Sequence, residues 1–369
     1  MRRRSRRPVA IDAGTTRFVA SRLTRRSVAV TLDASFIERR AAMPAAPLIR
    51  LVLAFGIAIA FPAGRAAGFQ HATVADPEGK PLEVGIWYPS RAAVAPLVLG
   101  PTTMAVALDG PVDRQALPLV VMSHGTGSSD LGHYDTAIAL ADAGYVVAAV
   151  THTGDHWADR SRSLFVMDRP RQVSRVVDHL LSGWSAHAQI DPRRIGVFGF
   201  SAGGFTALVM VGGVPDLSTI GPMCARYPAD FACRLIAGAG RMPDPAERAP
   251  GPDRRIRAAV VAAPALGFTF AGDGLKGVTV PVQLWRAEND TVLPHPRYAE
   301  AVRQALPIAS DYHVVAGAGH FDFLAPCSDA LAAIAPVICA SAPGFDRSAF
   351  HRSFDAAVVR FFDAALPAR

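Results

Sequence analysis

The sequence predicts an α/β fold with a mostly parallel central sheet and helices on both faces. Continuous apolar runs at residues 117–122, 145–150 and 256–262 are typical of strands that are buried on both sides. Segments with helical spacing lie between such runs, as they do in βαβ units. The chain has 369 residues, of which 50% are hydrophobic, so it is long enough for one large domain with a substantial core.

One apolar run ends in Gly199-Phe200-Ser201-Ala202-Gly203, and a helical pattern of small residues follows it. The order of strand, sharp turn and helix is that of the nucleophile elbow of the α/β-hydrolase fold, in which the serine hydroxyl is exposed at the turn. Glycine suits both flanking positions because a Cβ there would collide with the opposite segment. The sequence therefore predicts an α/β-hydrolase fold with Ser201 as its nucleophile.

The positive charge of the chain is concentrated at its N-terminus. Residues 1–42 carry eleven Arg and three acidic residues, a balance of +8, so the remainder carries −1 of the total of +7. No basic stripe follows, and we expect no nucleic-acid partner. We interpret residues 1–42 as a disordered or wrongly assigned extension and Met43 as the true start.

Residues 43–66 have the organisation of a secretory signal peptide. A short basic region precedes the apolar run 51–61, and small residues up to Ala66 form a cleavage zone. The run is too short for a stable membrane span, so we expect a periplasmic or secreted protein without one. A long twin-arginine leader that uses Arg6 and Arg7 is the alternative.

We expect residues 68–369 to form one hydrolase domain, monomeric, with a dimer as the alternative. Residues 68–76 and 82–89 alternate as an antiparallel hairpin does, and residues 91–114 have the composition of a loop. The other expected elements are, in order, a strand at 117–122, a helix ending near 143, a strand at 145–150, a helix at 169–181, the elbow strand at 194–200, strands at 256–262 and 280–286, a helix at 296–306, a strand at 311–315 and an amphipathic helix at 349–365.

Four cysteines form two pairs that are close in sequence, Cys224 with Cys233 and Cys327 with Cys339, as expected of two disulfides in an exported protein. Residues 214–254 are long and rich in Pro, Gly and Arg, and so long a loop inside a domain is usually functional. We interpret it as a cap or lid held by the first disulfide over the serine. A surface insertion without substrate contact is the alternative.

A serine hydroxyl needs a general base, and in this fold the acid and then the histidine follow the serine along the chain. His320 lies just beyond the last predicted strand, after glycines that let the backbone turn. His295 lies at the start of a predicted helix close to the candidate acid, His313 falls within a strand pattern, and His351 falls within the terminal helix. His320 is therefore the candidate base.

The candidate orienting acid is Asp290, at the carboxyl end of the penultimate predicted strand, the edge at which open α/β sheets bind their ligands. Glu288, Asp273 and Asp322 are the competitors. Two amides should hold the oxyanion of the tetrahedral intermediate. One is that of Ala202, directly after the nucleophile, and the other should come from residues 125–127.

The chain from about Gly68 to its end resembles the platelet-activating-factor acetylhydrolase group and its bacterial relatives, which are labelled predicted dienelactone hydrolases. The resemblance rests on the segments Met122-Ser123-His124-Gly125-Thr126-Gly127, Val147-Ala148-Ala149-Val150-Thr151-His152, Gly199-Phe200-Ser201-Ala202-Gly203-Gly204 and Gly319-His320-Phe321-Asp322-Phe323. It implies a serine hydrolase that acts on esters, and it implies that the amide of Thr126 is the second oxyanion donor.

The chain departs from these relatives at two positions. The animal acetylhydrolases place their acid after the strand that matches residues 257–263, where this chain has Ala263-Pro264 and no carboxylate. True dienelactone hydrolases have a cysteine at the elbow, where this chain has Ser201. The acid must therefore come from elsewhere, and dienelactone is not the expected substrate.

Five further side chains are candidates for substrate contact, namely His124, His152, His156, Trp157 and Phe200. A metal site around His152 and His156 is an alternative, and Phe200 is equally compatible with the core. We expect neither a metal nor a cofactor. The sequence thus predicts a serine hydrolase that cleaves small carboxylic esters, with short acyl chains preferred. The alternatives are a peptidase or acyltransferase with the same three residues, a metal-dependent hydrolase and a non-catalytic binding protein.

Overall fold

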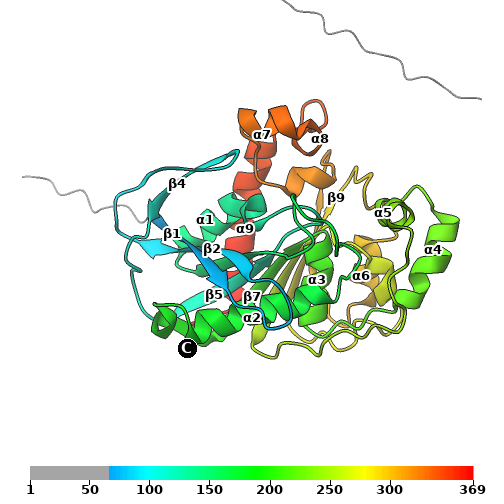
Figure 1. Cartoon of the computed structure of the whole chain (residues 1–369), viewed down its shortest axis with the longest axis horizontal. Helices are drawn as coiled ribbons and strands as arrows, with labels where there is room; N and C mark the ends of the chain where they lie inside the picture. Colours follow the sequence, from blue (N-terminus) through cyan, green and yellow to red (C-terminus); the bar gives the residue numbers. More distant parts are fainter. Residues whose placement is uncertain (1–65, 369) are drawn as a thin grey trace, which may run out of the picture. The chain divides into compact units, whose positions relative to one another are not determined.

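The computed structural model describes residues 66–368, in which ten strands form one mostly parallel sheet (Figure 1). The predicted N-terminal extension, and the predicted signal peptide apart from Ala66, lie outside the described residues. The strands, in their order across the sheet, are β10 (Asp311–Val315), β9 (Val282–Ala287), β8 (Ile256–Ala262), β7 (Ile190–Phe200), β5 (Leu117–Ser123), β6 (Val146–Thr151), β2 (Leu82–Ser90), β1 (Ala66–Val74), β4 (Thr102–Leu108) and β3 (Ala95–Leu99).

The six strands from β10 to β6 are mutually parallel, so all of their carboxyl ends lie at one edge of the sheet. The β1–β2 hairpin continues the sheet with antiparallel pairing from β6 to β2 and from β2 to β1. The predicted hairpin and the predicted parallel core are both confirmed. This is the architecture of an α/β-hydrolase fold.

Helices cover both faces of the sheet. The longer ones are α1 (Tyr134–Ala143), α2 (Asp168–Ser182), α3 (Ala202–Met210), α5 (Phe231–Ala239) and α9 (Arg347–Ala365). The shorter ones are α4 (Ile220–Arg226), α6 (Ala299–Ala305), α7 (Asp329–Ile334) and α8 (Pro336–Cys339).

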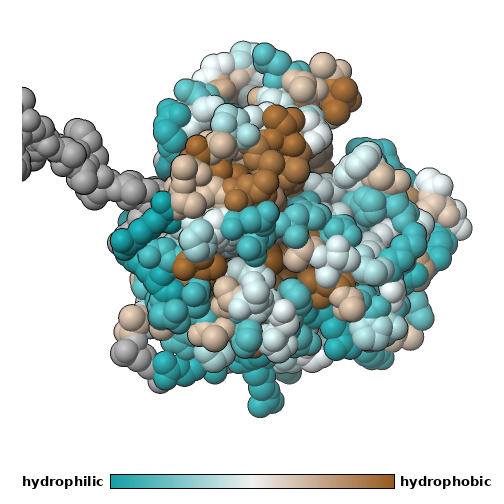
Figure 2. All heavy atoms as spheres, turned by 60° about the vertical axis from the view of Figure 1, so that its left-hand side comes forward, coloured by the Kyte–Doolittle hydropathy of each residue, from teal (hydrophilic) through white to brown (hydrophobic). Residues whose placement is uncertain are grey.

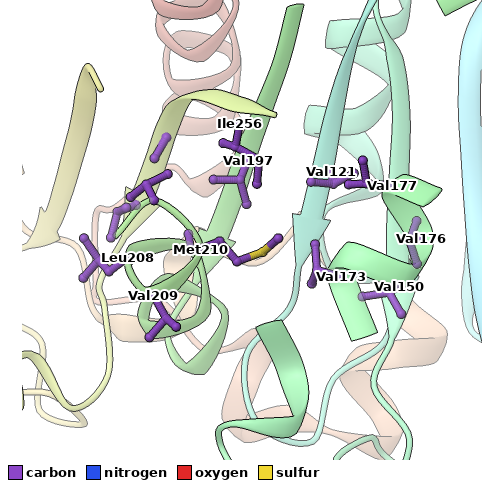
Figure 3. Packing of buried hydrophobic residues seen from close by; sticks show 14 of the residues in the cluster. Val121, Val150, Val173, Val176, Val177, Val197, Leu208, Val209, Met210 and Ile256 are labelled. Carbon is purple, nitrogen blue, oxygen red and sulfur yellow. The ribbon is translucent and has the colours of Figure 1, made fainter. Parts of the chain in front are cut away.

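Each face of the sheet has its own hydrophobic core because successive side chains of a strand point to opposite sides. On β5, Val121 packs in the core under α2, α3 and α6, whereas Val120 and Met122 pack in the core under α1 and α9. Figure 3 shows the first core, where Met210 of α3 lies between strand and helix side chains. The two cores fix the central strands, and with them the edge that carries the elbow.

Two parts of the chain differ from the sequence-based expectation. Residues 91–114, predicted to be a loop, contain the edge strands β3 and β4, which form an antiparallel hairpin. Residues 214–254, predicted to be irregular, contain α4 and α5, and the Cys224–Cys233 disulfide joins these two helices. The second predicted disulfide, Cys327–Cys339, is also present, and it encloses α7.

Among the helices of residues 66–368, none combines the length and the apolar character that a membrane crossing would require. The two disulfides are of a kind that persists in oxidising compartments, and they are compatible with export.

Candidate active site

Ser201 lies at a strained turn between β7 and α3, with φ of 55° and ψ of −116°. A positive φ is costly for a residue with a side chain, so the surrounding structure must impose it. The strand and helix approach so closely that a Cβ at Gly199 would lie 2.0 Å from the carbonyl oxygen of Gly203. A Cβ at Gly203 would lie 1.8 Å from the carbonyl oxygen of Ser123. The two glycines of the motif therefore make the elbow possible.

His320 reaches Ser201 from the loop that follows β10. Its Nε2 lies 3.1 Å from Oγ of Ser201, and its Nδ1 lies 2.7 Å from Oδ2 of Asp290. The other carboxylate oxygen of Asp290 accepts hydrogen bonds from the amides of Val292 and Leu293, at 2.9 and 2.7 Å. These amides fix the carboxylate so that one oxygen remains for the imidazole. The structure thus brings together the three residues that the sequence predicted as a triad.

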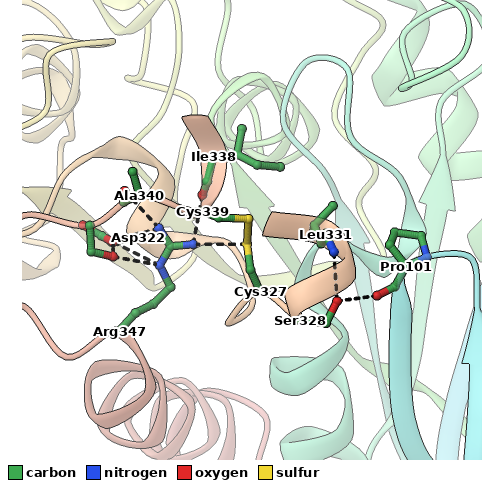
Figure 4. The surroundings of a disulfide bond; sticks show 10 residues. Pro101, Asp322, Cys327, Ser328, Leu331, Ile338, Cys339, Ala340 and Arg347 are labelled. Atoms are coloured by element: carbon green, nitrogen blue, oxygen red, sulfur yellow. Dashed lines mark hydrogen bonds and ion pairs between the residues drawn. A yellow bond between two sulfur atoms is a disulfide. The ribbon is translucent and has the colours of Figure 1, made fainter. Parts of the chain in front are cut away.

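The His320 loop is fastened to α9 through Asp322. One oxygen of this carboxylate accepts the amide of Gly319, the other accepts Nε of Arg347, and the Asp322 carbonyl accepts Nε2 of His351. Figure 4 shows Arg347 spanning Asp322 and the chain near the Cys327–Cys339 disulfide. Asp322, a competitor for the acid role in the sequence, therefore holds the loop that carries the imidazole.

The loop after β5 passes beside Ser201. Gly125 lies against the elbow, where an added Cβ would be 3.0 Å from the Phe200 ring and 3.3 Å from Cβ of Ser201. Gly127 has a φ of +72°, which allows the chain to turn away again. Within residues 66–368, the amides of Thr126 and Ala202 donate no hydrogen bond to another backbone or side-chain group. Both are therefore free to bind a negatively charged oxygen.

Two cavities meet at Ser201. One is a small apolar pocket of about 50 Å³, and the other is a groove of about 1090 Å³. The pocket lies between the elbow helix and residues 214–254, which contribute Ile220, Phe231 and Ile236 to its wall. This segment thus lines the space beside the serine, and its role as a cap or lid stays a prediction. His320 lines the groove and is absent from the lining of the pocket.

The groove has a second wall that the sequence analysis missed. The α7–α8 segment contributes Leu331, Ile334 and Ile338, and the β3–β4 hairpin faces it with Leu99. Ser328 Oγ donates to the carbonyl of Pro101, and this bond joins the two structures (Figure 4). Figure 2 shows apolar surface gathered on the upper part of the face that it presents. The close cysteine pair was the one sequence signal for an ordered segment here.

The five predicted substrate-contact residues divide into two groups. His156, Trp157 and Phe200 line the groove, and Trp157 is 74% exposed. His124 and His152 lie behind it, fully buried. The ring of His152 contacts Oγ of Ser123 at 2.8 Å and Oε1 of Gln172 at 2.7 Å, so neither ring nitrogen is open to a metal or a substrate.

Burial and the charge of Arg169 lower the pKa of His124 to about 3 and that of His152 well below its usual value. Both rings are therefore neutral at physiological pH. Arg169, on the first turn of α2, forms a buried ion pair with Asp155. Nothing in its helical sequence pattern marks this pairing.

Three side chains of types that can bind a metal lie close together elsewhere in the described part of the chain. Oxygen and nitrogen atoms of Asp135, His351 and Asp355, on α1 and α9, lie within 4.8 Å of one another. Nδ1 of His351 is 2.6 Å from the Asp135 carboxylate, in the geometry of an ion pair. None of the three lines the pocket or the groove at Ser201.

The comparisons with known proteins agree with this fold. Residues 120–219, which include the elbow, match the model of the prolyl oligopeptidase family. A ferulic acid esterase from Streptomyces cinnamoneus has a similar structure, with a TM-score of 0.57 and 23% sequence identity over 85% of this chain and 93% of that one. The search of curated proteins finds no match. The resemblance to the acetylhydrolase group stays a prediction, and the chain is a protein of the α/β-hydrolase fold.

Proposed function

We propose that this protein is a serine hydrolase that cleaves carboxylic esters through an acyl-enzyme. The observation that carries the proposal is the continuous contact from Oγ of Ser201 through the His320 ring to Asp290, with distances of 3.1 and 2.7 Å. A serine hydroxyl becomes nucleophilic when an oriented base takes its proton. All three side chains are buried at the sheet edge where ligands bind in open α/β folds.

Ser201 Oγ attacks the ester carbonyl carbon while Nε2 of His320 takes the hydroxyl proton. The amides of Thr126 and Ala202 stabilise the resulting oxyanion, and Asp290 stabilises the imidazolium. When the C–O bond to the alcohol breaks, His320 gives its proton to the departing oxygen. Water then attacks the acyl-enzyme with His320 again as base, which releases the acid and restores Ser201.

The two cavities assign the two halves of the substrate. The departing alcohol must receive its proton from His320, so it lies in the large groove that His320 lines. The acyl chain then occupies the pocket on the other side of Ser201. At about 50 Å³ this pocket has room for only a few water-sized groups, so we infer acyl chains of about two to four carbons. The substrate class is an ester of a short acid with a bulky, largely apolar alcohol.

The test is a series of p-nitrophenyl esters of increasing acyl length, assayed on the wild type and on Ser201→Ala. Turnover should be fastest for short chains and absent in Ser201→Ala. Ile236→Ala should enlarge the acyl pocket and move the optimum to longer chains. Ile334→Ala, which trims the groove wall, is the matched control and should leave the acyl optimum in place. A wild-type preference for long, micellar chains would contradict the acyl assignment.

The match of residues 120–219 to the prolyl oligopeptidase family favours a peptidase as the second candidate. Cleavage of an amide begins with the same attack on the carbonyl carbon but expels an amine, which is a poorer leaving group than an alcohol. The same three residues could therefore serve a peptidase. Matched nitrophenyl esters and nitroanilides of one acyl group distinguish the two activities. Added alcohols or amines that divert the acyl group from water would indicate an acyltransferase.

A further inference from the structure

The buried ion pair of Arg169 and Asp155 forms hydrogen bonds to the loop that carries Thr126, on both sides of that residue. Nη2 of Arg169 lies 2.7 Å from Oδ2 of Asp155, and the two side chains are 2% and 4% exposed. On one side of Thr126, Nη1 of Arg169 donates to the carbonyl of His124 at 2.7 Å. On the other side, the amide of Gly127 donates to Oδ1 of Asp155 at 3.1 Å. The peptide units 124–125 and 126–127, which flank the unit that carries the Thr126 amide, are therefore held by opposite partners of the same pair.

Neither member of the pair lines the pocket or the groove, so neither can touch a substrate bound there. Asp155 is held further by Oγ of Ser163, and Nε of Arg169 makes a second contact to Asp155 at 3.1 Å. Burial alone would raise the pKa of the Asp155 carboxyl, but the Arg169 charge and these hydrogen bonds outweigh it and lower the pKa. The Asp155 carboxylate therefore stays ionised at neutral pH.

A buried ion pair is costly to desolvate, and apolar residues of similar size often give equal stability. Stability alone therefore does not account for a charged pair at this position. Its distinctive property is directional, because the guanidinium presents separate N–H groups to a carboxylate and to a backbone carbonyl at fixed angles. A lysine ammonium in its place would keep the charge and lose this geometry.

We propose that Arg169 and Asp155 are positioning residues that aim the Thr126 amide at the oxyanion. This inference rests on the proposed function of the site. The pair acts through the loop, and its effect should be mainly on the free energy of the transition state, because negative charge on the carbonyl oxygen develops there. Ground-state binding of the ester, which depends on the pocket and groove, should change little.

The test compares Arg169→Lys with Arg255→Lys. Arg255 also bonds two carboxylates, those of Asp253 and Asp178, and neither belongs to the loop that carries Thr126. Arg255→Lys is therefore the matched control. Arg169→Lys should lower kcat by about 10-fold or more with KM within about 3-fold. Affinity for a trifluoromethyl ketone, which forms a tetrahedral adduct with Ser201, should fall by a similar factor. Arg255→Lys should change neither quantity.

Arg169→Met combined with Asp155→Leu separates positioning from stability. It should melt close to the wild type and yet keep the low kcat and the weak ketone affinity. If the double variant had both the melting temperature and the kcat of the wild type, the proposal would be overturned, because the pair would then have a purely structural role. Unchanged kcat and ketone affinity in Arg169→Lys would also overturn it.

Hydrogen exchange gives a readout that does not depend on activity. Amides of the peptide that spans residues 124–128 should exchange faster in Arg169→Lys than in the wild type and in Arg255→Lys. Equal exchange in all three would contradict positioning of the loop. Failure of the proposed function is recognised separately, by ester hydrolysis that survives in Ser201→Ala.

Discussion

Oδ2 of Asp290 lies 2.7 Å from Nδ1 of His320, although the two residues are 30 positions apart and come from loops after different strands. The pairing is specific because Oδ1 of Asp290 is already bonded to two backbone amides. Oδ2 therefore remains to accept the hydrogen bond from Nδ1–H of His320. This leaves Nε2 of His320 unprotonated and facing Ser201, which is the tautomer that a general base requires.

Asp290→Asn should keep the fold and lower kcat by about 10³- to 10⁴-fold, because a neutral amide neither fixes this tautomer nor stabilises the imidazolium. Glu288→Gln is the matched control. The Glu288 side chain is a neighbouring carboxylate that bonds to the Gly317 amide at 2.8 Å on the surface. Steady-state kinetics with a short-chain ester would measure both. Equal losses in the two variants would remove Asp290 from the acid role.

Gly203→Ala should destabilise the protein by about 3 kcal/mol or more. The added Cβ would lie 1.8 Å from the carbonyl oxygen of Ser123 and 2.9 Å from that of His124, and backbone atoms cannot rotate away. Gly238→Ala, within α5, meets no atom within 4 Å and should be neutral or slightly stabilising. Soluble yield and thermal melting would report the difference. Wild-type melting of Gly203→Ala would show that the elbow is looser than these contacts require.

Loss of either disulfide should lower thermal stability, by about 3 kcal/mol for loops of this size in the chain-entropy model. The kinetic effects should differ. Cys327→Ser with Cys339→Ser loosens the groove wall and should raise KM for esters of bulky alcohols more than for ethyl esters. Cys224→Ser with Cys233→Ser loosens the pocket wall and should instead broaden the tolerated acyl length. The same change in both double variants, or an unchanged melting temperature, would contradict this assignment.

The central strands and the elbow are predictable because each depends on a local pattern. Strands buried on both faces are continuously apolar, and the elbow requires Gly199 and Gly203 by contact. The approach of Asp290 and His320 to Ser201 follows from strand order, since parallel strands bring their carboxyl ends to one edge. The geometry matches the prediction, while the catalytic roles stay predictions.

The remaining features lack a local pattern. The β3 and β4 strands lie at an edge with mixed exposure, so their sequences do not alternate clearly. The α7 and α8 helices have six and four residues, too few for a helical period to stand out. The Arg169–Asp155 pair joins a helix to a loop 14 residues earlier in the chain, and the two side chains meet only once the chain between them has folded. Contacts of this kind are decided by tertiary structure.

The pH dependence of stability should change in His133→Phe. His133 is 4% exposed between the Phe198 and Phe200 rings. Burial lowers its pKa to about 4, with the Asp135 charge opposing this shift and His351 adding to it. Between about pH 6.5 and 4, His133 binds a proton in the unfolded chain but not in the folded chain. The contribution of His133 to the free energy of unfolding therefore decreases as the pH falls through this range. The drop in melting temperature from pH 7 to pH 5 should therefore be smaller in His133→Phe than in the wild type, and an equal or larger drop would show that His133 is protonated in the folded state.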